Sequence, residues 1–190
     1  MGPIIFFVLL AVVALWVVGA YNRLIALKNQ VVNGWKQIDV QLKRRHDLIP
    51  NLVETVKGSM NFEKSTLEAV ISARNKAMGA SGVQETAKAE GQLTQALGRL
   101  FALSEAYPDL KSNQNVLQLQ EELTGTENKI GFARQAYNDM ATQYNTAQMQ
   151  FPTTLLAGLA KAVPAELWEI QDAGERAVPK VDLGFGAPKA

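Results

Sequence analysis

An uncharged apolar run near the start of the chain, IIFFVLLAVVALWVVGAY at residues 4–21, constrains the fold more than any other feature. As a helix rising 1.5 Å per residue, the run reaches roughly 27 Å, close to the ~30 Å hydrocarbon core of a bilayer. Trp16 and Tyr21 lie toward its end and Arg23 follows, and such side chains favour the membrane–water interface. We therefore predict a transmembrane anchor over 4–21, with these three residues at the interface.

A cleaved secretory signal is the alternative for this run. Such a signal carries basic residues before its apolar part and small residues at its cleavage site. No basic residue precedes the run, and Val18-Gly19-Ala20 is a weak match to a cleavage site. The sequence therefore favours a retained, single-pass span.

The charges after the span predict its orientation. Arg23, Lys28, Lys36 and the basic residues 43–45 follow it, against Asp39 alone. The positive-inside rule then places the rest of the chain in the cytoplasm, attached to the inner (cytoplasmic) cell membrane. A periplasmic or otherwise extracytoplasmic body is the alternative, because only Arg23 and Lys28 are directly beside the span.

Composition excludes several classes of protein. The 47% hydrophobic and 19% charged content over 190 residues predicts one folded domain plus an accessory segment. A net charge of +1, with no RNA- or DNA-binding motif, argues against nucleic acid as a partner. The absence of cysteine excludes disulfides, thiolate metal sites, thiol nucleophiles and a lipoprotein anchor.

From residue 22 onward, apolar residues recur at intervals of three and four, which predicts an all-α fold. The last predicted helix shows the heptad pattern of coiled-coil helices. The economical arrangement is an up-down-up-down four-helix bundle over 22–151. The predicted helices run from Asn22 to Lys57, from a cap at Asn61 to Met78, from about Gln84 to Tyr107, and from a cap at Ser112 or Asn113 to Phe151.

The first and last helices are the longest, roughly 54 and 60 Å against roughly 26 and 36 Å for the middle pair, so the bundle is elongated. In this topology the long pair extends beyond the short pair at the membrane end. The apolar residues there would lack cover from their own chain, and we expect other copies to cover them in a homo-oligomer. This predicted seam consists of Val31, Trp35, Ile38, Tyr137, Met140 and Tyr144.

Residues 152–175 are predicted as a weaker amphipathic helical segment, broken at Pro164. Folding back over the seam is the alternative to oligomerisation. The segment can also lie on the bilayer surface, but packing on the bundle is favoured because it is poor in basic residues. Its apolar residues are Leu155, Leu156, Leu159 and Trp168, and a Pro- and Gly-rich flexible tail is expected over 176–190.

No catalytic, cofactor-binding or metal-binding residues are predicted. His46 is the only histidine, so the Glu-x-x-His pairs of di-iron bundles are absent. Asp47 points about 100° away from His46 around a helix and cannot orient it for catalysis. No nucleophile-elbow, phosphate-loop, zinc-protease or dinucleotide-binding motif is present. We expect His46 to be an exposed or half-buried structural residue in a protein that is not an enzyme.

Arg45 occupies a position on the apolar stripe of the first soluble helix, where an apolar residue is expected. A partly buried arginine requires a carboxylate. We therefore predict a structural ion-pair network that fixes helix register, with Arg45 or Arg44 paired to one of the glutamates of the last helix. Its members are Arg44, Arg45, Asp47, Glu121, Glu122 and Glu127.

Pro50 lies inside the first soluble helix. It removes one backbone N–H and clashes with the carbonyl of His46, so the helix must bend or restart there. The apolar spacing continues across Pro50 without a slip. We therefore predict a continuous helix with a kink at Pro50, which wraps it around the shorter helices.

Several long motifs resemble those of the LemA family, and the resemblance covers residues 21–182. It implies a helical bundle on one N-terminal membrane anchor in bacteria, without an established enzymatic activity. Members include a magnetosome-membrane protein, and others occur with a membrane zinc metalloprotease or stress-related membrane factors. Some relatives carry a lipoprotein leader, which this cysteine-free chain lacks. The motifs are YNRLIALKNQVVNGWKQIDVQLKRRHDLIPNLVETVKG, TLEAVISAR, EAYPDLKSNQN, LQEELTGTENKIGFARQAYND and YNTAQMQFP.

Two functions from different classes fit these observations. The first is a self-assembling membrane-anchored scaffold that organises membrane or envelope proteins. The second is an adaptor or regulator of one membrane-protein partner, such as a membrane-bound zinc metalloprotease in envelope stress. The adaptor would bind its partner through the face that carries residues 44–51 and 107–109.

Overall fold

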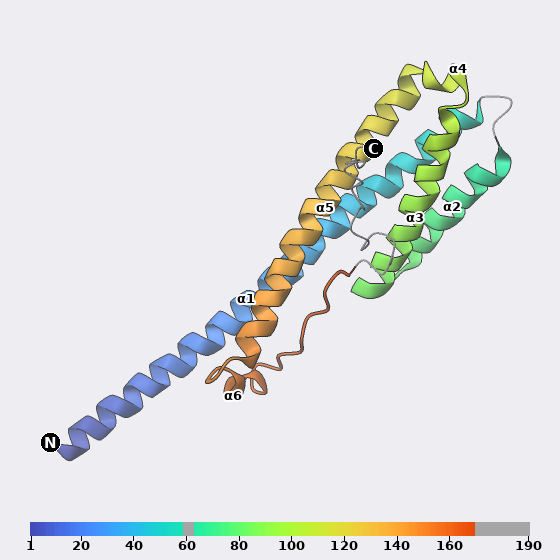
Figure 1. The fold of residues 1–190 in the computed structure, drawn as a ribbon. Helices are drawn as coiled ribbons and strands as arrows, with labels where there is room; N and C mark the ends of the chain where they lie inside the picture. Colours follow the sequence, from blue (N-terminus) through green and yellow to red (C-terminus); the bar gives the residue numbers. More distant parts are fainter. Residues whose placement is uncertain (59–62, 170–190) are drawn as a thin grey trace, which may run out of the picture.

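The computed structural model describes residues 1–58 and 63–169, and all regular elements in these ranges are helices. The all-α prediction is therefore confirmed. In Figure 1 the four long helices run alternately away from and back toward the N-terminal end. The elements are α1 (Gly2–Lys57), α2 (Lys64–Gly79), α3 (Val83–Ser104), α4 (Pro108–Lys111), α5 (Gln114–Met149) and α6 (Thr154–Ala157).

α1 joins the predicted span and the first bundle helix in one uninterrupted helix of 56 residues. Its N-terminal part is long and apolar enough to cross a membrane, and none of that window is buried against the rest of the chain. The sequence predicted an anchor that ends at residue 21 and a bundle that begins at residue 22. No glycine or proline lies between this boundary and Gly34, so the helix continues across it. The anchor and the body therefore share one helix.

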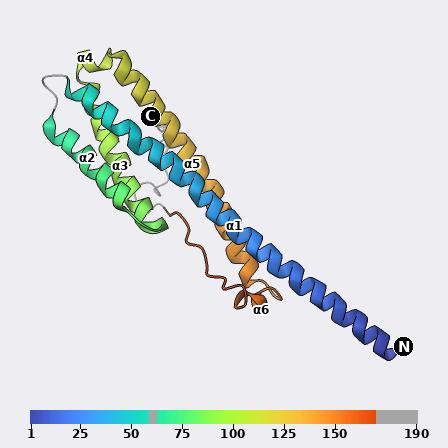
Figure 2. The same ribbon diagram turned by 180° about the vertical axis from the view of Figure 1, so that it is seen from behind.

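The part of the chain after the apolar run contains two hydrophobic cores. The head core draws on all four long helices and on α4, whereas the stalk core lies mainly between α1 and α5. Figure 2 shows the α1–α5 pair extending beyond α2 and α3 toward the N-terminus. We call the four-helix part the head and the α1–α5 pair from residues 22–42 and 130–149 the stalk. The buried head core contains Ile49, Leu52, Val53, Val56, Leu67, Val70, Ala73, Ala77, Leu93, Leu97, Leu100, Leu110, Val116 and Leu123.

Gly34 fixes how the two stalk helices meet. A Cβ at this position would lie 3.1 Å from Met140 Sδ and 3.5 Å from Tyr137 Cα, so glycine permits the close approach. Because α1 and α5 are antiparallel and rise equally per residue, a residue a given number of positions before Gly34 lies level with the residue the same number of positions after Tyr137. Counting along both helices from Gly34 and Tyr137 places Met149, the last residue of α5, level with Asn22.

Helix ends follow local chemistry. Asn113 is the cap of α5, because its Oδ1 accepts from the backbone N of Asn115 at 2.9 Å and of Val116 at 3.4 Å. α3 ends at Ser104, three residues before the predicted Tyr107, and the single turn α4 follows. The predicted cap Asn61 lies outside the described residues.

The chain after α5 turns back along the stalk. Residues 154–157 form one helical turn, and residues 162–169 have no regular secondary structure. The amphipathic helix predicted over 152–175 is therefore wrong for 162–169, where side chains from the bundle hold the backbone extended instead. We call residues 164–168, whose backbone is bound by side chains of α5, the strap. The rest of that segment, 170–175, and the tail at 176–190 lie outside the described residues.

Candidate functional site

A buried polar network lies where the head and the stalk join. Arg45, only 3% exposed, extends from α1 into the bundle. Its Nη1 donates to Glu90 Oε2 on α3 at 3.0 Å, and its Nη2 donates to Thr94 Oγ1 at 2.8 Å. Glu127 Oε2 on α5 lies 3.1 Å from the same Nη1, a charge contact without hydrogen-bond alignment. One guanidinium thus connects three helices.

His46 completes the set of partners of Glu90. Its Nε2 lies 2.6 Å from Glu90 Oε1. A carboxylate paired with Arg45 only accepts, so Nε2 carries the proton and donates. At 8% exposure, His46 is buried, and the expectation of an exposed or half-buried side chain is wrong. The residue is buried because α3 supplies a carboxylate that the sequence did not reveal as its partner.

A side chain of α2 replaces the backbone hydrogen bond that Pro50 removes from α1. In a regular helix the N–H of residue 50 would donate to the carbonyl of His46, and proline has no N–H to give. Arg74 replaces it, because its Nε donates to the His46 carbonyl oxygen at 2.7 Å. α1 continues through Pro50 as a helix. The prediction of a kink there stays a prediction, but the carbonyl that Pro50 leaves free binds α2 to α1.

The network stabilises the fold and has little capacity for chemistry. Both oxygens of Glu90 are engaged, and the Arg45 guanidinium already has Glu90, Thr94 and Glu127 as partners. The cavity of about 220 Å³ beside Arg45 and Glu127 is otherwise largely apolar, with Leu97, Phe101 and Leu123 in its walls. Within the described ranges, no group of three His, Asp or Glu side chains is placed to hold a metal ion.

The predicted network members separate in the structure. Arg45 and Glu127 meet, whereas Arg44, Asp47 and Glu121 are exposed and Glu122 is half-buried outside the network. Sequence reasoning missed Glu90, although a signal for it exists. Glu90 lies on the apolar stripe of α3, where it breaks the pattern as Arg45 does in α1. The buried residues of that stripe are Thr86, Ala87, Glu90, Leu93, Leu97, Leu100 and Ser104.

A second set of polar side chains holds the strap on the stalk. Asn145 Nδ2 donates to the Ala165 carbonyl and its Oδ1 accepts from the Ala165 N–H, both at 2.8 Å. Asn138 binds Trp168 in the same way, at 3.0 and 2.8 Å. We call these two asparagine–backbone pairs the clasps. The seven helical residues from Asn138 to Asn145 and the three extended residues from Ala165 to Trp168 both span roughly 10 Å, so both clasps can form at once. Each asparagine thus satisfies the backbone of a segment that has no sheet partner.

Trp168 anchors the end of the strap. Its ring centre lies 5.9 Å from that of Trp35, and the Arg134 guanidinium lies 5.6 Å above it. Tyr137 packs against Trp35 at 5.6 Å, and its hydroxyl donates to the Glu166 carbonyl at 2.8 Å. Burial, and then the Glu166 charge, raise the pKa of Tyr137. Burial also raises the pKa of Tyr144.

The strap corrects the prediction of an uncovered seam. Val31, Ile38, Tyr137 and Tyr144 are buried within one chain, and Trp35 and Met140 are partly buried against the same core. Residues 160–168 supply much of the cover, so no second copy is needed on this face. The folding-back alternative describes the molecule, although the covering chain is mostly not helical.

The predicted interface residues Trp16, Tyr21 and Arg23 are exposed along α1, beside the apolar run. No other element of the described ranges, 1–58 and 63–169, covers them. Their position is compatible with the membrane–water interface, which stays a prediction.

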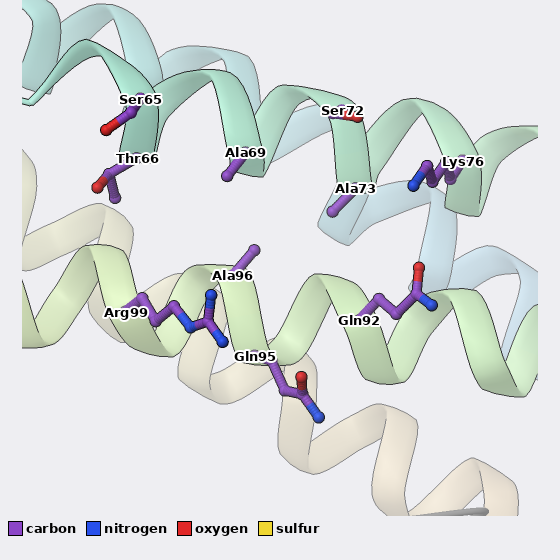
Figure 3. A pocket seen from close by; sticks show the side chains of 10 residues that line it. All are labelled: Ser65, Thr66, Ala69, Ser72, Ala73, Lys76, Gln92, Gln95, Ala96 and Arg99. Atoms are coloured by element: carbon purple, nitrogen blue, oxygen red, sulfur yellow. The ribbon is translucent and has the colours of Figure 1, made fainter.

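A groove of about 430 Å³ lies between α2 and α3 on the face away from α1 and α5 (Figure 3). Ala69 and Ala73 of α2 point toward Ala96 of α3, so small side chains form its centre. Among the described residues that line it, Lys76 and Arg99 are charged and none is acidic. The rest of the lining is hydroxyl or amide: Ser65, Thr66, Ser72, Gln92 and Gln95.

Comparison with known proteins adds a family relationship. The sequence profile of the LemA family matches residues 34–183. Protein LemA of Metamycoplasma hominis is 31% identical over 157 residues, covering 81% of this chain and 71% of that protein. Magnetosome protein MamQ 2 of Paramagnetospirillum magneticum is 24% identical over 181 residues, covering 82% and 66%. Magnetosome protein MamQ of Magnetospirillum gryphiswaldense is 23% identical with the same coverage.

Proposed function

The chain belongs to the LemA family, and on this premise we propose that it is a single-pass, membrane-anchored scaffold that holds a partner-binding head at a fixed distance from the bilayer. Neither the names of its relatives nor the chemistry of the buried network points to an enzyme. The observation that carries the proposal is the unbroken α1, which runs from the apolar segment to the far end of the head.

The stalk gives the scaffold its reach. From Tyr21 to Lys57, α1 rises roughly 54 Å, so the tip of the head lies that far from the end of the span. A lone helix of this length bends easily, but α5 packs along it and the strap packs on both. In this proposal the length of α1 therefore sets the distance between the bilayer and the head.

The groove between α2 and α3 is the docking surface in this proposal. Lys76 and Arg99, with no acidic side chain among the described lining residues, favour an acidic segment of a partner protein. Hydroxyl and amide groups along both walls supply donors to a carboxylate-bearing partner. A membrane-protein partner is favoured, because the head is tethered to the bilayer.

Self-assembly, if part of this function, needs a face other than the strap-covered seam. The outer side of the stalk exposes Val40 and Phe132 beside a groove of about 580 Å³. Lys36 and Lys129 flank this groove, and their long side chains can reach solvent around a second copy. A monomeric mass in detergent for the full chain at all concentrations would remove self-assembly from the proposal.

We place the head in the cytoplasm on the charge rule, and the cysteine-free sequence allows a direct test. Ser81 is exposed in the turn between α2 and α3. Its Ser81→Cys variant should resist a membrane-impermeant maleimide in intact cells and react after permeabilisation. Labelling in intact cells, once any outer membrane is opened, would place the head outside the cytoplasm.

The scaffold role is tested by photo-crosslinking in cells. A photoreactive residue at Gln92, on the groove, should capture one or a few membrane proteins, whereas one at the exposed Gln118 of α5 should not. A flexible eight-residue insertion after Arg23 should change the captured set, because the head then loses its fixed height. An unchanged set would argue against the spacer role. One partner at a fixed ratio, captured regardless of the insertion, would instead favour the adaptor, for example of a membrane zinc metalloprotease.

A further inference from the structure

The turn between α5 and the strap exposes an unusual number of large apolar side chains. Five side chains within residues 149–163 are between 69% and 79% exposed. Leu156 and Ala160, from the same turn, are buried. One side of the turn thus packs on the body, and the other side is exposed. The exposed side chains are Met149, Phe151, Leu155, Leu159 and Val163.

The turn lies level with the end of the apolar run of α1. The close contact of Gly34 with Tyr137 places the end of α5 level with Asn22, one residue beyond the apolar run. Counting in the same way from the ion pair of Arg45 with Glu127 places Met149 level with Arg23, one residue from the first result. α6 also contacts α1 directly. Figures 1 and 2 both show α6 beside the end of α5, where α1 continues alone toward the N-terminus.

We propose that this turn is a second membrane contact, whose exposed side chains enter the interfacial layer of the same bilayer that α1 spans. The inference rests on the membrane anchoring in the proposed function. The sequence of 149–163, MQFPTTLLAGLAKAV, has one charged residue, Lys161, and no acidic residue. The support therefore comes from the apolar side chains rather than from charge, because the strength of interfacial binding grows with the apolar area that is buried at the headgroup boundary.

A lipid surface accounts for the exposed face better than a protein partner does. The exposed residues lie at the level where the apolar run of α1 ends, so the bilayer that α1 is proposed to span would lie beside them. With two contacts, the body can no longer rotate freely about the axis of α1. The turn therefore fixes which face of the head points along the membrane.

The test uses single cysteines in the full-length protein, labelled with an environment-sensitive fluorophore and placed in phosphatidylcholine vesicles with or without brominated acyl chains. Leu159→Cys should be quenched by the brominated lipid, approaching Val18→Cys in the span. Ser81→Cys, in the head, should show no quenching. Failure of Val18→Cys to be quenched would remove the anchor itself, and with it both proposals.

Quenching of Leu159→Cys no greater than that of Ser81→Cys would overturn the second contact while leaving the anchor in place. Blue-shifted emission without quenching would also overturn it, because protein rather than lipid would then cover the turn. A further variant checks the apolar face. Quenching at Phe151→Cys should fall to the Ser81→Cys level when Leu155 and Leu159 are both replaced by glutamate, with helicity unchanged by circular dichroism. Unchanged quenching would contradict the proposal.

Discussion

The head and the stalk build a core from the same helices in different ways. In the head, four helices surround a buried cluster of aliphatic side chains. In the stalk, two helices meet and an extended strap forms the third layer. There the buried side chains include Tyr137, Tyr144 and Trp168.

The difference shows what an extended layer requires. A helix satisfies its own backbone, so it can cover a core with apolar side chains alone. An extended segment has free N–H and C=O groups along its length, and these must find partners when they are covered. Asn138 and Asn145 supply the partners in the stalk, so its third layer is stabilised by amide side chains as well as by apolar burial.

The largest effect is expected where the two regions join. Glu90→Leu leaves Arg45 and His46 without their buried acceptor, which should lower the free energy of unfolding by roughly 3–5 kcal/mol. Denaturant titration of the detergent-solubilised chain measures the change. Glu121→Leu, at an exposed site on α5, is the control and should change stability by less than about 0.5 kcal/mol. Equal stability of the two variants would show that the network does not join head and stalk.

Removing the anchor of the strap should separate the two regions. Trp168→Ala is expected to lower the free energy of unfolding by about 3 kcal/mol, because a buried indole is lost from the stalk core. Hydrogen exchange should quicken in the strap and in α5 near Tyr137, with little change in α2 and α3. Leu159→Ala, at an exposed position, serves as the control. Equal quickening in α2 and α3 would mean that the regions unfold as one unit.

The asparagine clasps should have a smaller effect. Asn145→Ala leaves the N–H and the carbonyl of Ala165 without their partners, and should reduce stability by about 2 kcal/mol. Asn128→Ala, at an exposed position of the same helix, should change it by less than about 0.5 kcal/mol. The comparison is made by denaturant titration. If both variants behaved alike, water would satisfy the strap as well as Asn145 does.

The smallest effect is one of pH. The raised pKa of Tyr137 means that the folded chain keeps a proton that the unfolded chain loses as pH rises above the ordinary value of 10.0. Stability should therefore be full below pH 10 and fall above it, and Tyr144 contributes in the same direction. Tyr137→Phe loses about 1 kcal/mol at neutral pH with the hydroxyl bond, but flattens the alkaline fall. An alkaline profile unchanged in Tyr137→Phe and Tyr144→Phe would contradict this assignment.

Helices were predictable because their signals are periodic or local. Spacing by three and four identified the long helices, and the pair Ser112 and Asn113 narrowed the cap of the last of them to two residues, of which Asn113 is the cap. The same spacing revealed Arg45, because a charge on an apolar stripe is an exception to a strong pattern. Glu90 breaks the pattern of α3 in the same way and was available to the same reasoning.

The strap was not predictable in this way. An extended segment outside a sheet shows no periodic spacing of apolar residues. The asparagines that hold it bind backbone N–H and C=O groups, and every non-proline residue has both, so the sequence of the segment does not reveal the contact. The hydrogen bond from Arg74 to the carbonyl of His46 was also not predictable, because it depends on which helix packs beside the carbonyl that Pro50 leaves without a backbone donor. Tertiary position, rather than residue type, determined these contacts.

The continuity of α1 has a mechanical consequence. Because α1 is one uninterrupted helix, the body of the proposed membrane-anchored protein would move as a lever whose short arm is the span. Transmembrane helices change tilt with the thickness of the surrounding bilayer. Over an arm of about 54 Å, a 10° change in tilt displaces the far end of the head by roughly 9 Å. The head would thus report the thickness of the membrane to any protein bound to it.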